Sequence, residues 1–209
     1  MQKAIFMLAA ALVLTLHLSA QAKLKVLHNF GSASDGSAPS GPLAFDSRGN
    51  LYGLTAGGGQ DGFGSVFELT PQKNATWREQ ILYSFKGGSD GEGPEGNVAL
   101  GVTETLYGTL YDTTVGTGAV FELKRSGGNW ANNILYTDGA GPGLLPDKFG
   151  DLYGGIGHGN GVYGAIGELS PGSSGWSYAA LYDFCATSCT GGDDLLAPPF
   201  GTTTAISGA

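Results

Sequence analysis

Four aspartates recur at one place in a repeated pattern, and their type suits either a turn or a cation ligand. Asp35, Asp90 and Asp138 each precede a glycine, and Asp193 occupies the equivalent region near the end of the chain. Aspartate before glycine favours a tight turn, because glycine adopts positive φ and the carboxylate accepts hydrogen bonds from nearby amides. Ca²⁺ takes about six to eight oxygen ligands, and the chain has no Asp-x-Asp-x-Asp-Gly run. The pattern therefore favours turns, with a cation or ligand site as the alternative.

Three glutamates, Glu68, Glu122 and Glu168, form a second repeated set at one position of a short apolar segment. A glycosidase needs two carboxyl groups about 5–9.5 Å apart, and sequence spacing does not give that distance. A structural hydrogen bond or salt bridge in each repeat is the simpler interpretation. An extracellular carbohydrate-active enzyme using Glu68, Glu122 or the turn aspartates is the alternative. We expect no catalytic constellation, and therefore no enzyme.

The two cysteines, Cys185 and Cys189, are four residues apart. In an exported protein this spacing predicts a local disulfide that constrains one loop. A metal site would need further ligands nearby, and His28 and His158 are distant in sequence. We therefore expect a disulfide, no metal at this pair and no cofactor.

The first 22 residues have the layout of a secretory signal peptide. Lys3 supplies a positive start, residues 4–18 are almost wholly apolar, and Ser19-Ala20-Gln21-Ala22 ends in small residues. A membrane anchor would need a longer apolar run, about 20 residues. We expect cleavage after Ala22, secretion to the periplasm or the extracellular space, and no membrane span afterwards.

Composition restricts the fold and the partners of the chain. Glycine accounts for 38 of 209 residues and charged residues for only 13%, which disfavours helices. Hydrophobic residues make up 41%, enough for a packed core. The formal net charge is −8 and no cluster of lysine or arginine occurs, so a nucleic-acid partner is not expected. An all-β protein with many tight turns remains.

The chain contains an internal repeat with a step of 46–55 residues. Its markers are a Leu-Tyr-Gly triplet, a Glu-Leu pair, a tryptophan and a Leu-Tyr pair, always in this order. The triplet begins at Leu51, Leu106 and Leu152, and the tryptophans are Trp77, Trp130 and Trp176. Four markers in constant order indicate tandem structural units.

Within one unit the sequence predicts four short strands, at 41–46, 51–55, 65–70 and 76–85, separated by turns. Strands joined by tight turns pair antiparallel. We therefore expect four-stranded antiparallel units of β-propeller-like size at about 41–90, 96–140 and 144–190, all within one β-repeat domain, 23–209. A partial strand is expected at 25–30 and a partial unit at 191–209.

Three units are fewer than the four blades usual in a closed propeller. The sequence therefore leaves three alternatives: a truncated reading frame, an arc that closes by self-association through its blade edges, or a fragment of a larger ring.

The repeated unit resembles the Gloeo/Verruco (GloVer) tandem-repeat family of exported bacterial proteins, of the choice-of-anchor type. The residues that carry the resemblance are 49–55, 64–69 and 81–91, with echoes at 106–109, 118–123, 151–154 and 181–194. It covers roughly residues 24–200. The resemblance implies a secreted or surface-anchored, propeller-like repeat protein without established biochemical activity.

These observations together predict a secreted, non-catalytic repeat protein that binds an unknown extracellular glycan or protein. The enzyme named above and a truncated remnant without function are the alternatives.

Overall fold

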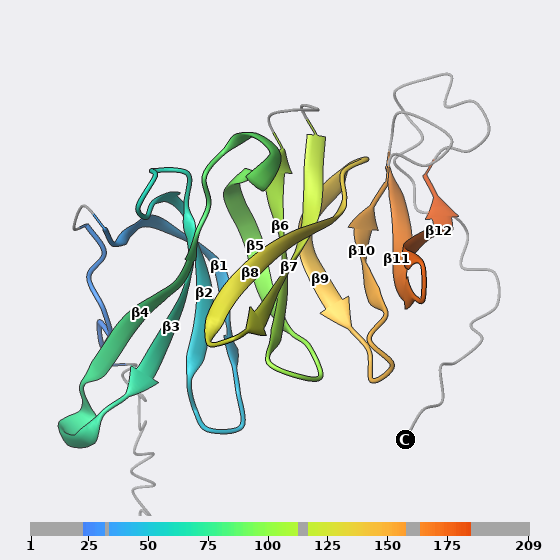
Figure 1. Cartoon of the computed structure of the whole chain (residues 1–209). Helices are drawn as coiled ribbons and strands as arrows, with labels where there is room; N and C mark the ends of the chain where they lie inside the picture. Colours follow the sequence, from blue (N-terminus) through green and yellow to red (C-terminus); the bar gives the residue numbers. More distant parts are fainter. Residues whose placement is uncertain (1–22, 32–33, 113–116, 158–163, 185–209) are drawn as a thin grey trace, which may run out of the picture.

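The computed structural model describes residues 23–31, 34–112, 117–157 and 164–184. Its regular structure is almost entirely β, with twelve strands in three sheets that lie side by side (Figure 1). The first sheet contains β1 (Gly36–Phe45), β2 (Leu51–Gly58), β3 (Ser65–Pro71) and β4 (Trp77–Ser84). The second contains β5 (Glu92–Leu100), β6 (Thr105–Asp112), β7 (Thr117–Ser126) and β8 (Asn129–Tyr136). The third contains β9 (Ala140–Pro146), β10 (Leu152–Ile156), β11 (Ala165–Gly172) and β12 (Gly175–Asp183).

Every sheet is an antiparallel meander in which consecutive strands are neighbours. Each repeat marker keeps its position in the register: Leu51 pairs with Leu69 in the first sheet, as Leu152 pairs with Leu169 in the third. The all-β fold and the four-stranded antiparallel units predicted from the sequence are therefore confirmed. Two single-turn 3₁₀ segments, Lys73–Ala75 and Gly88–Asp90, occur in connections. Among the described residues, no helix is long and apolar enough to cross a membrane.

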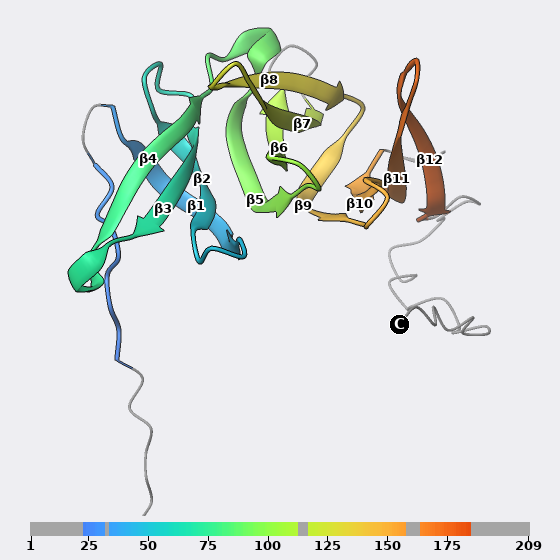
Figure 2. The same cartoon turned by 60° about the horizontal axis from the view of Figure 1, so that its bottom comes forward.

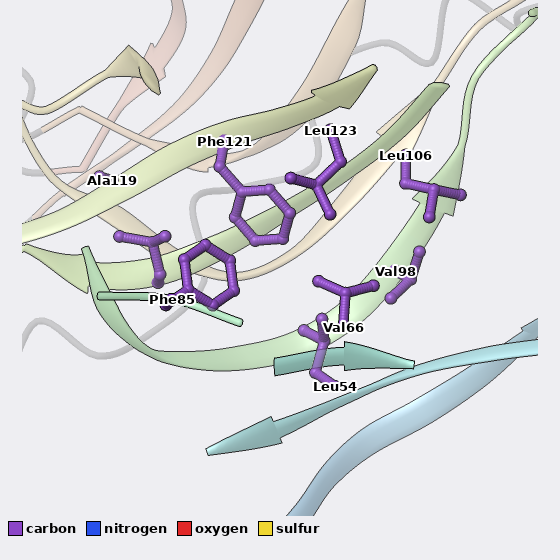
Figure 3. Packing of buried hydrophobic residues seen from close by; sticks show 9 residues of the cluster. Leu54, Val66, Phe85, Val98, Leu106, Ala119, Phe121 and Leu123 are labelled. Carbon is purple, nitrogen blue, oxygen red and sulfur yellow. The ribbon is translucent and has the colours of Figure 1, made fainter. Parts of the chain in front are cut away.

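The hydrophobic core lies between successive sheets (Figure 3). Leu54 and Val66 of the first sheet pack with Phe121 of the second and with Phe85 of the connection between them. A second cluster joins Val120 of the second sheet to residues of the third sheet. Because strand side chains alternate between faces, Phe121 and Val120 point to opposite neighbours. The middle sheet is thus buried on both faces.

The inner edges of the sheets approach each other closely. Figure 2 shows β1, β5 and β9 along the inside of an arc, with β4, β8 and β12 further out. A Cβ atom on Gly41, whose φ is +73°, would lie 1.6 Å from the carbonyl oxygen of Gly96. Glycine is therefore required where β1 meets β5.

Residues 25–30, predicted as a partial strand, belong to none of the strands of the described structure. The prediction is wrong because their backbone is not paired with a sheet edge. Instead, Leu27 and Phe30 pack on the outer face of the first sheet, against Leu51, Phe67 and Leu69. The segment covers that face without extending a sheet.

The outer face of the third sheet is more exposed than the equivalent faces of the other two. Phe85 is fully buried, whereas Phe184, at the same position of the repeat, is 43% exposed. Val66 and Val120 are fully buried, whereas Ile166 is 39% exposed. The apolar pattern of the repeat therefore continues onto a face without a described neighbouring sheet.

Candidate functional site

The three repeated glutamates each accept a hydrogen bond from a tyrosine hydroxyl on the neighbouring strand. The Oη–Oε1 distances are 3.0 Å for Tyr52–Glu68, 3.4 Å for Tyr107–Glu122 and 3.1 Å for Tyr153–Glu168. Burial, followed by the charge of the glutamate, raises the pKa of Tyr52 and of Tyr107 to about 12. The structural hydrogen bond favoured by the sequence is therefore present in every repeat.

The predicted aspartates act in the turns of separate repeats. Asp90 accepts hydrogen bonds from the Tyr83 hydroxyl at 2.7 Å, the Lys86 amide at 2.9 Å and the Asn132 side chain at 3.0 Å. Asp35 is buried and accepts a hydrogen bond from the Gly36 amide at 2.8 Å. The turn interpretation thus explains Asp90 and one oxygen of Asp35, whereas the other oxygen of Asp35, Oδ2, lies 3.1 Å from His28 Nε2.

The remaining predicted site residues have few described interactions or lie outside the described residues. The charge of Asp138 contributes to the raised pKa of Tyr136 and Tyr178, after the larger effect of burial. Within the described part of the chain, the one cluster of three metal-ligand side chains includes Asp35 but neither Asp90 nor Asp138. The speculated turn aspartates therefore do not converge on one site. Asp193, Cys185 and Cys189, together with the expected signal peptide at 1–22, lie outside the described residues.

A groove of about 510 Å³ lies between the first and second sheets. Tyr52, Glu68, Arg78 and Gln80 line it from the first sheet, and Trp130 from the second. Tyr52, Glu68 and Gln80 form a row because they are cross-strand neighbours on β2, β3 and β4. A volume of about 300–1,000 Å³ is typical of small-ligand sites.

All three arginines of the chain, Arg48, Arg78 and Arg125, line this one groove. They come from the turn after β1, from β4 and from β7, which are 30 and 47 residues apart in sequence. Their side chains are exposed, and no hydrogen bond or ion pair of a guanidinium group occurs within the described residues. In an acidic chain, the groove therefore gathers the strongest anion-binding side chains, with their donors available.

Two of the acidic residues of the groove are engaged by their own sheet. Asp46 accepts hydrogen bonds from the amides of Arg48 at 2.8 Å and Asn50 at 2.9 Å. Burial opposes the charge of Asp46, but these hydrogen bonds outweigh it and lower the pKa of the carboxyl. Glu68 accepts a hydrogen bond from the Tyr52 hydroxyl. These two carboxylates are thus fixed within the fold, whereas the three guanidinium groups and a third carboxylate of the lining, Glu104, are exposed to solvent.

The groove was not predicted from the sequence. Two of its aromatic residues, Tyr52 and Trp130, also pack against the core cluster around Leu54 and Phe121. The arginines carry no motif, and only the packing of two sheets brings them together. The small number of arginines, three in 209 residues, was the available signal.

The family comparison agrees with the repeated architecture. The family model described as the Gloeobacter/Verrucomicrobia repeat matches residues 10–205. The chain belongs to this family. No curated protein sequence matches the chain. The membership of the GloVer family, expected from the Leu-Tyr-Gly and Glu-Leu markers, is therefore confirmed, while the ligand has to be argued from the site.

Proposed function

We propose that this GloVer-family protein is an exported, non-catalytic binding protein, and that the groove between its first two sheets holds an acidic extracellular polysaccharide. The observation that carries the proposal is the position of Arg48, Arg78 and Arg125 around one groove. Guanidinium groups bind carboxylates and sulfates through paired, charge-assisted hydrogen bonds.

The other groove residues favour a sugar over a simple anion. Tyr52 and Trp130 offer aromatic surface with a polar atom, which suits the mixed apolar and hydroxyl surface of a sugar ring. Gln80 adds an amide with two donors and an acceptor. The net charge of −8 would repel a polyanion at a distance, so binding depends on contacts made within the groove.

The proposal includes the architecture and the location of the protein. The three sheets are blades of a propeller-like ring, of which the exposed face of the third sheet is an open end. The apolar segment 4–18 directs export, and the mature chain acts in the periplasm or outside the cell. Self-association through the open end would bring further blades together.

The experiment is binding of the purified protein to a panel of immobilised polysaccharides, comparing uronate-rich and sulfated chains with neutral ones. We expect retention on acidic polysaccharides that weakens as the salt concentration rises. The double variant Arg78→Ala, Arg125→Ala is expected to lose at least tenfold in affinity. The matched control is Lys73→Ala, Lys148→Ala, which removes the same charge from exposed residues that do not line the groove, and it should bind as the wild type.

Two results would overturn the proposal. Equal losses in the arginine and lysine variants would mean that only net charge matters. Sustained release of reducing ends from a bound polysaccharide, abolished by Glu68→Gln with the fold retained, would make the protein a carbohydrate-active enzyme.

A further inference from the structure

A cluster of His28, Asp35 and Glu79 lies on the outer face of the first sheet, away from the groove. One ligand atom from each residue can be chosen so that all three atoms lie within 4.8 Å of one another. His28 Nε2 is 3.1 Å from Asp35 Oδ2. The cluster is thus compact enough to surround a single ion.

The packing of the first sheet fixes these side chains. Glu79 lies on β4 between Trp77 and Ile81, two residues that pack against the same cluster as Leu27 and Phe30. The ring of His28 contacts Phe30 edge-on, with 4.6 Å between centroids. The segment before β1 is therefore held over β4, which places His28 of the segment close to Glu79 of the strand.

The same three positions recur, with different chemistry, at the junction between the first and second sheets, where they lie on β4, in the following 3₁₀ segment and on β8. The repeat places Tyr83 at the position of His28, Asp90 at that of Asp35 and Asn132 at that of Glu79. There the tyrosine and the asparagine both donate hydrogen bonds to Asp90. Asp90 is therefore satisfied by neutral donors.

In the cluster of His28, Asp35 and Glu79 both donor positions hold other residues, and the result is a pair of carboxylates beside an imidazole. The side chain of Asp35 is only 9% exposed. Glu79 Oε1 is buried and has no hydrogen-bond partner within the described residues. Two carboxylates held together in this way repel unless a cation or a proton lies between them.

We propose that His28, Asp35 and Glu79 bind one divalent transition-metal ion, with Zn²⁺ the best match. Imidazole nitrogen and carboxylate oxygen are both ordinary zinc ligands, and three protein ligands leave one position of a tetrahedral site for water or another group. Ca²⁺ is a poorer match because it requires more oxygen ligands and does not favour imidazole. The ion would join the segment before β1 to β4.

The test is calorimetric titration of Zn²⁺ into the tag-free full chain after treatment with a chelator. We expect one ion per chain, a dissociation constant in the micromolar range or below, and a higher Tm with Zn²⁺ than without. The double variant His28→Tyr, Glu79→Asn gives the cluster the two donors that surround Asp90. It should fold, keep or raise the metal-free Tm, and lose at least tenfold in Zn²⁺ affinity. Asp61→Asn, at an exposed acid of the same repeat, should bind Zn²⁺ as the wild type does.

Three results would overturn the site. These are the absence of Zn²⁺ binding by the wild type, unchanged affinity in the double variant, and tighter binding of Ca²⁺ than of Zn²⁺.

Discussion

The side chain of Asn97 joins two sheets by bonding the backbone of Leu144 in both directions. Its Nδ2 donates to the Leu144 carbonyl, and its Oδ1 accepts from the Leu144 amide, each over 3.0 Å. Leu144 lies on β9, the edge strand of the third sheet, whose only sheet neighbour is β10 among the described residues. The side chain of Asn97 therefore hydrogen-bonds to part of the free edge of β9 in the described structure.

Replacing this side chain tests how much the junction contributes. We expect Asn97→Ala to lower the free energy of unfolding by about 1–3 kcal/mol, because two partly buried backbone groups lose their partner. Urea denaturation measures the change. Asn129→Ala, at an exposed position of β8, is the matched control and should change stability by less than about 0.5 kcal/mol. Similar losses in the two variants would contradict the bridging role.

Alanine substitutions at two glycines distinguish the cost of a steric clash from the cost of backbone strain. Gly41 and Gly49 both have positive φ, +73° and +85°, but only Gly41 has backbone atoms where a Cβ would be placed. Gly49→Ala should cost about 1 kcal/mol, the usual strain of a left-handed residue. Gly41→Ala should cost several times more or prevent folding, because β1 and β5 would have to separate. Equal Tm values for the two variants would show that the inner strands are not in close contact.

The buried tyrosines predict a loss of stability at alkaline pH. The pKa values of Tyr52 and Tyr107 are raised from 10 to about 12, so folding favours their protonated forms. The contribution is fully present below pH 10, the pKa of the unfolded chain, and is lost between pH 10 and about 12. Stability should therefore fall with pH across this window, and less steeply in Tyr52→Phe. Urea midpoints measured at several pH values check this.

The control for that series is Tyr111→Phe, since Tyr111 is about half exposed on β6. It should retain the slope of the wild type. A slope that is unchanged in Tyr52→Phe would mean that neither burial nor Glu68 raises the pKa of Tyr52 in solution.

Two phenylalanines at one repeat position test the open face of the third sheet. Phe85→Ala should cost about 3–5 kcal/mol, as expected for a fully buried ring. Phe184→Ala should cost much less at low protein concentration, because its ring is partly exposed. A loss in Phe184→Ala as large as in Phe85→Ala would show that the face is covered in solution, and a dependence on protein concentration would identify a second copy as the cover.

Much of the fold could be predicted from the sequence, because its signals are local. The strand predicted at 65–70 is β3, Ser65–Pro71, and the strand predicted at 51–55 is the first part of β2. Such strands are recognised by the alternation of apolar and polar residues along them and by the turn residues at their ends. The segment at 25–30 was misassigned because its residues match a fourth strand, and the sequence does not show whether a sheet edge is available to pair with it.

The candidate sites could not be predicted in the same way, because each depends on distances between sheets or between distant segments. Arg78 and Arg125 carry no motif, and His28 and Glu79 are 51 residues apart. Asp35 was identified as a cation candidate, but its partners were not. For the cluster of His28, Asp35 and Glu79, the informative signal was a difference between repeats, such as Glu79 where the next repeat has Asn132.

The most direct test of the proposed function is an NMR titration of the protein with a uronate oligosaccharide. The chain has three arginines and three tryptophans, so the side-chain Nε–Hε and indole signals can be followed individually. If the groove is the binding site, all three arginine signals and the indole of Trp130 shift on addition of the ligand. The indoles of Trp77 and Trp176, which do not line the groove, stay in place. Shifts at those two indoles, with none at Arg78 or Arg125, would contradict the proposal.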